Sequence, residues 1–528
     1  MKGYVFLCVL LTLLLAAALF IMISTWEAVH MPALAALGIV VVVAAIVIAN
    51  ELRRPMPREY FRKKALFPRI PNKFLASKPQ SGSIIFGKDY HTHKTVVSEV
   101  GHHVLLCGST GSGKTATCLL PSILNYDGTG SLQIVDIKSR ELSYKSADVF
   151  NENTQIVDLN LRKPYVYGWD LLYKLKKDGT DTEQAVLDVV KEIAYVIVPR
   201  SKSGDSFWND AARNEFIGLF LYEYIYAVQA EFIVIVTSMM NIPLREHLES
   251  ALNGSPKTSL VASYLTSLAS SADETLFSVD LTLSQNLYPF VSEDAVYFFR
   301  DNKKRANPTA LNQEGVKQYL CVDEHKLDSG YDKFINIVMK QTLQELQSRT
   351  TSGSYAHCTL IWDEWQRLTE SVSSGADGDG GLRGATSSFI KTARSKHASV
   401  VLCVQNLDGF DKQLILDILS NIHYFYVLAS NNSQSFTTEV VTKMAGSYYE
   451  KEQSHSEGRG TSISTSFREK SVLKPEDLNC LGNDAVLIIT NHGYVRSNKE
   501  ATAYYKTEPY KSKYEKILAV NKTAMDGV

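Results

Sequence analysis

The chain has 528 residues, of which 55 are Lys or Arg and 56 are Asp or Glu, so its formal net charge is −1. This length allows two or three domains. The charge balance excludes a strongly basic protein that grips nucleic acid over its whole surface, so any such grip must be local. The 7 cysteines include no C-x-x-C pair, which argues against a disulfide framework or zinc site and fits a reducing cytosol.

Two uncharged apolar runs, 4–23 and 31–49, open the chain. Each is long enough to cross a bilayer as a helix, and a cleaved signal peptide is the alternative for the first run. Basic residues are abundant after the second run and absent from the connector, which predicts that both ends face the cytoplasm. We therefore expect a transmembrane hairpin over 1–50 and a basic juxtamembrane segment over 51–80, close to membrane lipid.

A glycine-rich stretch, "GSTGSGKT", lies between an apolar strand-like run and a helix-like run and fits the pattern G-x-x-x-x-G-K-[ST]. In such a loop, successive backbone N–H groups and the helix N-terminus surround a phosphate. Lys114 would reach the β- and γ-phosphates, and the Thr115 hydroxyl would bind Mg²⁺. The pattern predicts ATP and Mg²⁺ as cofactors, with an ordinary glycine-rich turn as the alternative. The predicted cradle is Gly108, Ser109, Thr110, Gly111, Ser112, Gly113, Lys114 and Thr115.

After the loop, strand-like runs ending near Asp136 and Asn160 precede a mainly helical pattern over 181–302. Strand and helix patterns then alternate toward the C-terminus, which predicts an α/β fold with a mostly parallel sheet covered on both faces. We expect a nucleotide-binding domain formed by 81–180 and 303–528, with an all-α domain at 181–302. Two polar segments, 371–388 and 450–467, are expected to be solvated loops or loops that respond to nucleotide or substrate.

The apolar run "TLIW" ends in two carboxylates, Asp363 and Glu364. A P-loop ATPase needs an acid at a neighbouring strand end to hold Mg²⁺ and a second acid to deprotonate the attacking water. Asp363 fits the metal role and Glu364 the role of catalytic base. A surface acid pair after a core strand is the alternative.

Three further features lie near predicted strand ends. Gln405 follows a strand and is predicted to contact the γ-phosphate or the attacking water, unless it is a simple polar residue at a strand end. Arg394 is predicted to be an arginine finger that acts on a neighbouring subunit, with a surface arginine as the alternative. The acidic and basic residues in "DIKSRE", including Lys138, form either a local ion cluster or a part of the site.

Together, "GSTGSGKT", "DIKSREL", "FWNDAAR", "IWDEW" and "VQNLDGF" resemble the motifs of the type IV secretion system coupling proteins, the TraG/TraD-type ATPases of bacterial conjugation. The resemblance implies a RecA-like P-loop domain, an all-α domain, a homo-hexameric ring with ATP between subunits and a place in the bacterial inner membrane. It also implies the transfer of DNA, usually a single strand with an attached relaxase, to a type IV secretion channel. The alternatives are a double-strand DNA translocase similar to FtsK or HerA, and a membrane-docked cargo receptor that uses ATP as an assembly switch.

Overall fold

The computed structural model of the chain describes residues 71–528 except 139, 177, 179, 200–205, 230, 351, 371–381, 430–433, 458–460, 491–492 and 527–528. The two predicted membrane spans and most of the basic segment lie outside this part.

Within residues 71–528, gaps excepted, no helix is both long and apolar enough to cross a bilayer. The helices α14 (Asp332–Ser348) and α20 (Tyr510–Asp526), for example, have 17 residues each and carry several charged side chains. This finding contradicts the predicted location in the bacterial inner membrane.

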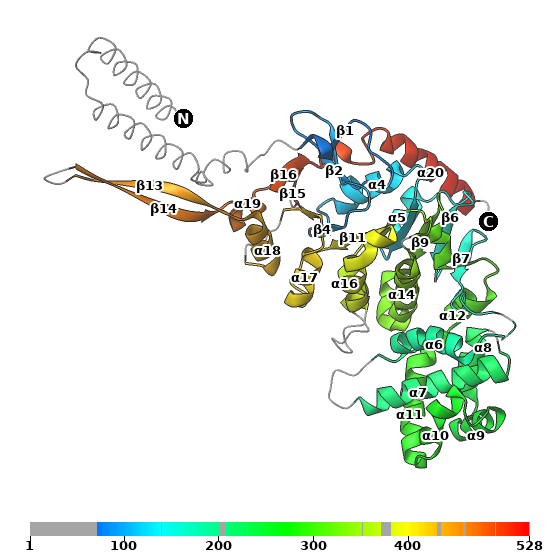
Figure 1. Ribbon diagram of the computed structural model, residues 1–528. Helices are drawn as coiled ribbons and strands as arrows, with labels where there is room; N and C mark the ends of the chain where they lie inside the picture. The colour runs from blue at the N-terminus through cyan, green and yellow to red at the C-terminus, as the bar shows by residue number, and fades with distance from the viewer. Residues whose placement is uncertain are drawn as a thin grey trace, which may run out of the picture. The chain divides into compact units, whose positions relative to one another are not determined.

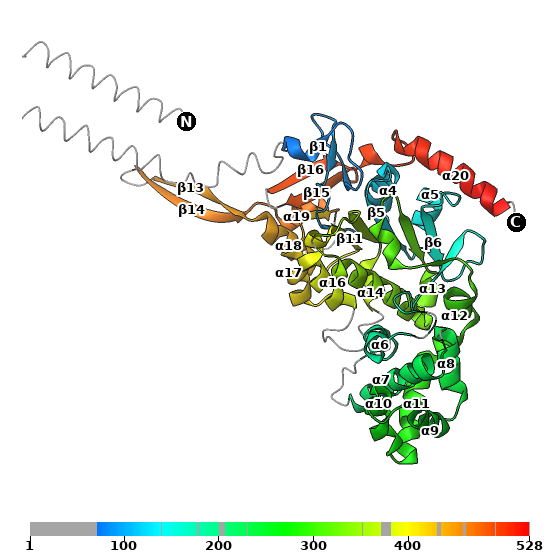
Figure 2. The same cartoon turned by 45° about the vertical axis from the view of Figure 1, so that its right-hand side comes forward.

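A sheet of 14 strands organises the described part of the chain. Its strand order is β1-β3-β2-β16-β15-β12-β4-β11-β10-β5-β9-β6-β7-β8. Figures 1 and 2 show the sheet from two directions. The strands are β1 (Leu75–Ala76), β2 (Ile85–Lys88), β3 (Thr95–Val97), β4 (Val104–Cys107), β5 (Ser131–Asp136), β6 (Thr154–Asp158), β7 (Val166–Trp169), β8 (Arg305–Ala306), β9 (Lys317–Cys321), β10 (Cys358–Trp362), β11 (Ala398–Val404), β12 (Tyr424–Val427), β15 (Ala485–Thr490) and β16 (Gly493–Asn498).

From β12 to β8 all neighbouring strands are parallel, and from β12 through β15 to β1 they are antiparallel. The predicted mostly parallel sheet is therefore confirmed.

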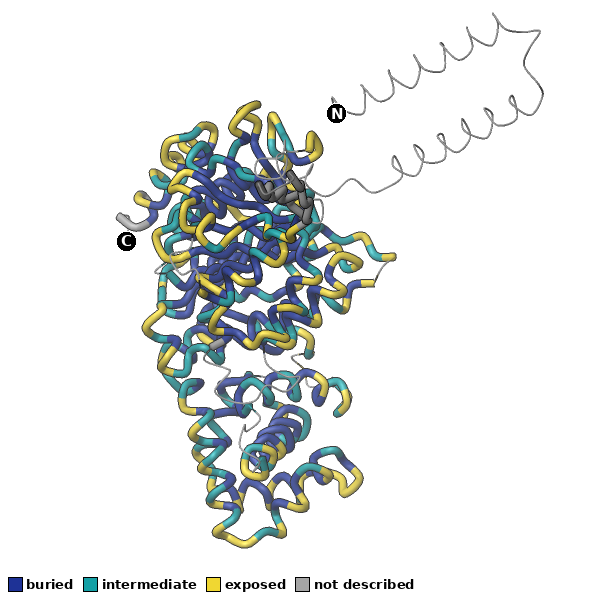
Figure 3. The backbone as a smooth tube through the Cα atoms, turned by 90° about the vertical axis from the view of Figure 1, so that its left-hand side faces the viewer, coloured by how far each residue is buried: buried dark blue, intermediate teal, exposed yellow. Residues whose placement is uncertain are grey.

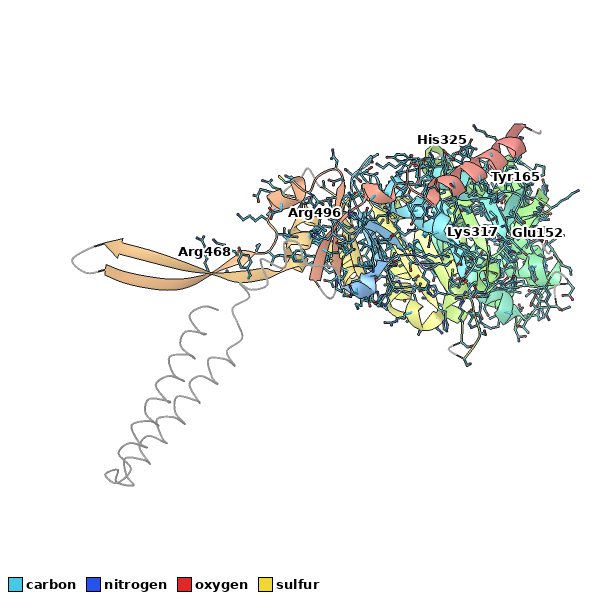
Figure 4. The ribbon with its side chains drawn as sticks, turned by 90° about the horizontal axis from the view of Figure 1, so that it is seen from above. Glu152, Tyr165, Lys317, His325, Arg468 and Arg496 are labelled. Atoms are coloured by element: carbon cyan, nitrogen blue, oxygen red, sulfur yellow. The ribbon has the colours of Figure 1, made fainter. Side chains whose placement is uncertain are left out.

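At the antiparallel end, Arg496 of β16 (labelled in Figure 4) donates a 2.9 Å hydrogen bond to the Leu481 carbonyl, and its guanidinium carbon lies 5.5 Å from the centre of the Tyr90 ring.

Helices cover both faces of the sheet and thereby bury its parallel strands on both sides. The buried parts of the chain are the dark blue tube in Figure 3. Alternate residues of β4 belong to two separate apolar clusters, Leu105 to one and Leu106 to the other. The Leu106 side is covered by α4 (Leu120–Asn125), α5 (Glu141–Ser146) and α20. The Leu105 side is covered by α14, α15 (Trp365–Glu370), α16 (Leu382–Thr392), α17 (Lys412–Leu419) and α18 (Phe436–Ala445).

The helical pattern predicted over 181–302 corresponds to a bundle of helices. These are α6 (Glu183–Ile197), α7 (Phe207–Leu221), α8 (Phe232–Asn241), α9 (Leu244–Gly254), α10 (Leu260–Ala269), α11 (Asp273–Leu287) and α12 (Glu293–Val296). Their apolar side chains belong to the same cluster as Leu105 and α14. Lys333 of α14 adds polar contacts, because its Nζ donates to the Ile197 carbonyl at 2.9 Å and to Asn286 Oδ1 at 2.7 Å.

Both predicted loops need correction. Residues 371–381 of the first lie outside the described part, but 382–388 belong to α16, where Leu382, Thr386 and Phe389 recur at helical spacing and are buried. Residues 450–457 and 461–467 of the second belong to two strands, β13 (Ser447–Glu457) and β14 (Thr461–Ser471), which form a two-stranded sheet of their own. The loop was predicted because the segment is polar and rich in Ser and Thr. It has no proline, however, and Thr is common in strands, so its residues are compatible with strands.

Candidate functional site

Four adjacent strands, β4, β11, β10 and β5, bring most of the predicted site residues to one edge of the sheet. They are parallel and in register, with Cys107 opposite Val404 and Trp362 opposite both Leu402 and Val135. Their carboxyl ends therefore meet. This edge is where ligands bind in open α/β sheets.

The glycine-rich loop follows β4 and leads into a continuous helical stretch made of η2 (Thr115–Leu119) and α4. Gly111 and Gly113 have φ angles of +76° and +95°, a region that favours glycine because it has no Cβ. Ser112 closes the turn by donating from its backbone N–H to the Ser109 carbonyl at 3.2 Å. The backbone has the strand–loop–helix geometry that the pattern predicts.

Lys114 is buried, and its ammonium group donates to the Gly108 carbonyl and, at 3.4 Å, to the Ser109 carbonyl. These contacts hold the Lys114 side chain across the start of the loop. The Thr115 side chain lies in the first turn of η2 and is partly exposed.

Asp363 and Glu364 follow β10 directly, and both are buried. Burial raises the pKa of Asp363 to about 6, against the opposing effect of the Lys138 ammonium. Glu364 has a φ of +51°. A side-chain-bearing residue rarely adopts this conformation, and such residues cluster at functional sites.

Lys138, two residues beyond β5, contacts the carboxylates directly. Its Nζ bonds Glu364 Oε1 and lies 3.9 Å from Asp363 Oδ2. These carboxylates raise the pKa of Lys138 although partial burial opposes the shift. Lys138 thus contacts both of the predicted site carboxylates. Asp136 instead accepts a 2.7 Å hydrogen bond from the Ser143 N–H and has a pKa raised by burial to about 7.

Gln405 follows β11, and its Nε2 donates a 3.1 Å hydrogen bond to Glu364 Oε2. Both carboxylate oxygens of Glu364 therefore have partners, Lys138 on one and Gln405 on the other. A cavity of about 220 Å³ lies beside this arrangement, with Gly108, Ser109, Gln405, Asp408, Leu428 and Thr437 in its wall.

Arg394 does not join this group within one chain. It belongs to η9 (Ala393–Lys396), which precedes β11, whereas Gln405 follows that strand. The strand has 7 residues, which places Arg394 about 20 Å away at the opposite edge of the sheet. Its side chain is exposed.

Lys499 was missed by sequence reasoning. Its buried ammonium donates to the Ser112 carbonyl in the glycine-rich loop, although 387 positions separate the two residues. Beside it, Thr502 Oγ1 donates to the Thr117 carbonyl at 2.8 Å, and the Tyr504 N–H donates to the Ala116 carbonyl at 3.1 Å. A segment near the C-terminus thus supports the loop from outside, and no motif in the sequence signals this.

The residues present suit a magnesium ion held together with a phosphate. Asp363 and Thr115 offer the hard oxygen ligands that Mg²⁺ prefers, and protein Mg²⁺ sites in nucleotide enzymes use few protein ligands. In the described segments, no group of three or more His, Cys, Asp or Glu could hold a metal ion on its own.

The chain matches a protein-family model and several solved structures. A family model described as "Type IV secretory system Conjugative DNA transfer" matches residues 68–527. No curated protein sequence matches the chain.

Among solved structures, the unbound bacterial conjugative coupling protein TrwBdeltaN70 superposes with a TM-score of 0.56 at 13% identity, over 75% of this chain and 84% of that chain. The plasmid coupling protein TrwB in complex with ADP and Mg²⁺ gives a TM-score of 0.54 at 15% identity, over 75% and 85%. TrwB in complex with the ATP analogue ADPNP gives 0.54 at 14% identity, again over 75% and 85%. These matches establish that the chain shares the α/β fold of TrwB.

Proposed function

The chain belongs to the type IV secretory system conjugative DNA transfer family, and on this premise we propose that it is an ATP-driven coupling protein that recruits and pumps DNA to a type IV secretion channel. In this proposal, 81–180 and 303–528 form the nucleotide-binding domain and 181–302 form an all-α domain. The DNA is a single strand with an attached relaxase, and the relaxase and the channel components are the protein partners.

One observation carries the ATPase assignment. The carboxyl ends of four adjacent strands bring a phosphate loop, a buried acid pair and a polar residue that bonds the second acid to one place. In addition, the fold is shared with TrwB, which has been solved with ADP and Mg²⁺ and with an ATP analogue.

In the proposed reaction, residues 108–115 hold the phosphates of ATP through backbone N–H groups. Lys114 leaves the loop carbonyls to neutralise the β- and γ-phosphates. Thr115 and Asp363 would hold Mg²⁺, which supplies positive charge to the triphosphate. Glu364 accepts the proton of the attacking water, and Gln405 orients Glu364 or the water.

We also propose that six copies form a ring and that Arg394 of one copy completes the site of the next. The position of Arg394 supports this, because its exposed guanidinium lies at the opposite sheet edge from the site of its own chain. An arginine that acts in trans stabilises charge only in the transition state. Its loss should lower turnover more than ATP affinity.

The basic experiment measures ATP hydrolysis with and without single-stranded DNA. Lys114→Ala and Glu364→Gln should each lower turnover roughly a hundredfold or more, and Glu364→Gln should still bind ATP. DNA should stimulate the wild type. Wild-type turnover by Glu364→Gln would refute the assignment of the base, and a slow rate indifferent to DNA would favour a cargo receptor.

The ring is tested by mixing Lys114→Ala with Arg394→Ala. If sites are shared between copies, some boundaries pair an intact loop with an intact arginine, and activity partly returns. If the two variants assemble together and no activity returns, Arg394 does not act between subunits. Full activity of Arg394→Ala alone would identify it as a surface arginine.

A further inference from the structure

Lys138 and Glu364 form an ion pair that competes with the attacking water of the proposed hydrolysis. To accept a proton from water, Glu364 needs an oxygen free to face that water. Its Oε1 is bonded to the Lys138 ammonium and its Oε2 to the Gln405 amide, which lies 3.1 Å away. In the observed arrangement, Lys138 therefore competes with the attacking water for Oε1 of Glu364.

The two partners of Glu364 differ in how easily they move. The Glu364 side chain is only 6% exposed and follows the buried strand β10, whereas the Lys138 side chain is 27% exposed and lies beyond the end of β5. A lysine ammonium is a point charge on a flexible four-carbon stem. Lys138 can therefore change partner without any movement of the sheet.

A γ-phosphate is the strongest competing partner that ATP would bring to this edge. It carries more negative charge than a carboxylate, and a lysine is a common phosphate ligand. Asp363, 3.9 Å from Lys138 Nζ, is the remaining acid that faces this ammonium.

On the basis of the proposed function, we propose that Lys138 is a positioning residue with two anionic partners. It holds Glu364 while the site lacks a γ-phosphate, and it transfers to the γ-phosphate when ATP binds, which frees Oε1 of Glu364 for water. ADP lacks the γ-phosphate and leaves the ion pair in place, so the same exchange makes the base available only when there is a bond to hydrolyse.

The exchange predicts a thermodynamic coupling between Lys138, Glu364 and the γ-phosphate. In the wild type, ADPNP must break the ion pair in order to bind, whereas in Glu364→Gln no ion pair has to be broken. We expect Glu364→Gln to bind ADPNP about tenfold more tightly than the wild type, the size of one charge-assisted hydrogen bond. The affinity for ADP should not change.

The test is a cycle of dissociation constants for ADPNP and ADP, measured by calorimetry on the wild type, Glu364→Gln, Lys138→Met and the double variant. Methionine keeps the length of the lysine stem without its charge. The gain in ADPNP affinity caused by Glu364→Gln should disappear in the Lys138→Met background. Lys145→Met is the matched control, because Lys145 bonds Glu141 on its own helix at 2.7 Å, and it should retain the full gain.

Two outcomes would overturn the exchange. If the double variant still gains ADPNP affinity, the gain comes from removing the charge of Glu364 and not from releasing Lys138. If ADP affinity rises as much as ADPNP affinity, the γ-phosphate is not the second partner. Failure of the proposed function would look different, since ADPNP would then bind the wild type and Lys114→Ala equally.

Discussion

Acid should destabilise the protein through His103, and the size of the effect follows from its surroundings. The ring is 2% exposed, and its Nδ1 accepts a 3.1 Å hydrogen bond from the Val400 N–H. Burial is the main cause that lowers the pKa of His103 to about 4, and the nearby His423 lowers it further. An imidazole in the unfolded chain has a pKa of about 6.5.

Because the pKa is lower in the folded state, the unfolded chain takes up a proton first as the pH falls. Nothing is lost above about pH 6.5, stability falls between about 6.5 and 4, and the full loss is reached below 4. At pH 5.0 the two pKa values give a loss of about 2 kcal/mol from this one residue.

The assay compares the free energy of unfolding in urea at pH 7.5 and 5.0 for the wild type and His103→Asn. Asparagine offers Oδ1 to the Val400 N–H and does not titrate. Losses from other histidines are common to both proteins, so the wild type should lose about 2 kcal/mol more than the variant. His325→Asn is the control, since His325 is exposed (Figure 4), and it should behave as the wild type. Equal losses in the wild type and His103→Asn would refute the reasoning.

Three further predictions concern the site. Gln405→Ala removes the hydrogen bond to Glu364 and should lower kcat roughly a hundredfold with little change in KM, measured by steady-state hydrolysis; an unchanged kcat would contradict it. In Gly108→Ala the new methyl group would lie 2.8 Å from Leu428, so nucleotide affinity should fall at least about tenfold, and an unchanged affinity in calorimetry would contradict this. Lys499→Met should weaken nucleotide binding about fivefold by releasing the Ser112 carbonyl, and unaltered binding in calorimetry would show that the loop needs no such support.

How much of the site could be predicted depended on distance along the chain. Residues 108–115 form a local motif, and its spacing alone was sufficient to predict the glycine-rich loop. Asp363 and Glu364 are predicted as site residues because an apolar run ends there, and the structure places both directly after β10. The pairing of Lys138 with Glu364 spans 226 positions, and that of Lys499 with Ser112 spans 387. No local pattern records such contacts, since they arise only when the sheet is assembled.

The order of strands explains the same limit for the fold. Alternating strand and helix patterns predicted the parallel centre of the sheet, where each strand is an apolar run of four to seven residues. The polar residues of β13 and β14 predict a loop, but two strands can bond to each other along their shared edge without an apolar face. Apolar composition thus predicted the buried central strands, but polar composition did not predict the backbone conformation of β13 and β14.

The strand order also has a consequence for the synthesis of the protein. β4 is made early, but its two neighbours, β11 and β12, begin at residues 398 and 424, and Lys499 follows later still. At about 5–20 residues per second, a ribosome needs roughly 20–80 s to add these 387 positions. Until residue 398 both edges of β4 lack their final partners, and unpaired strand edges are prone to mispairing. We expect nascent chains to depend on chaperones until these strands are made, and nucleotide affinity to reach its full value only after Lys499 has been added.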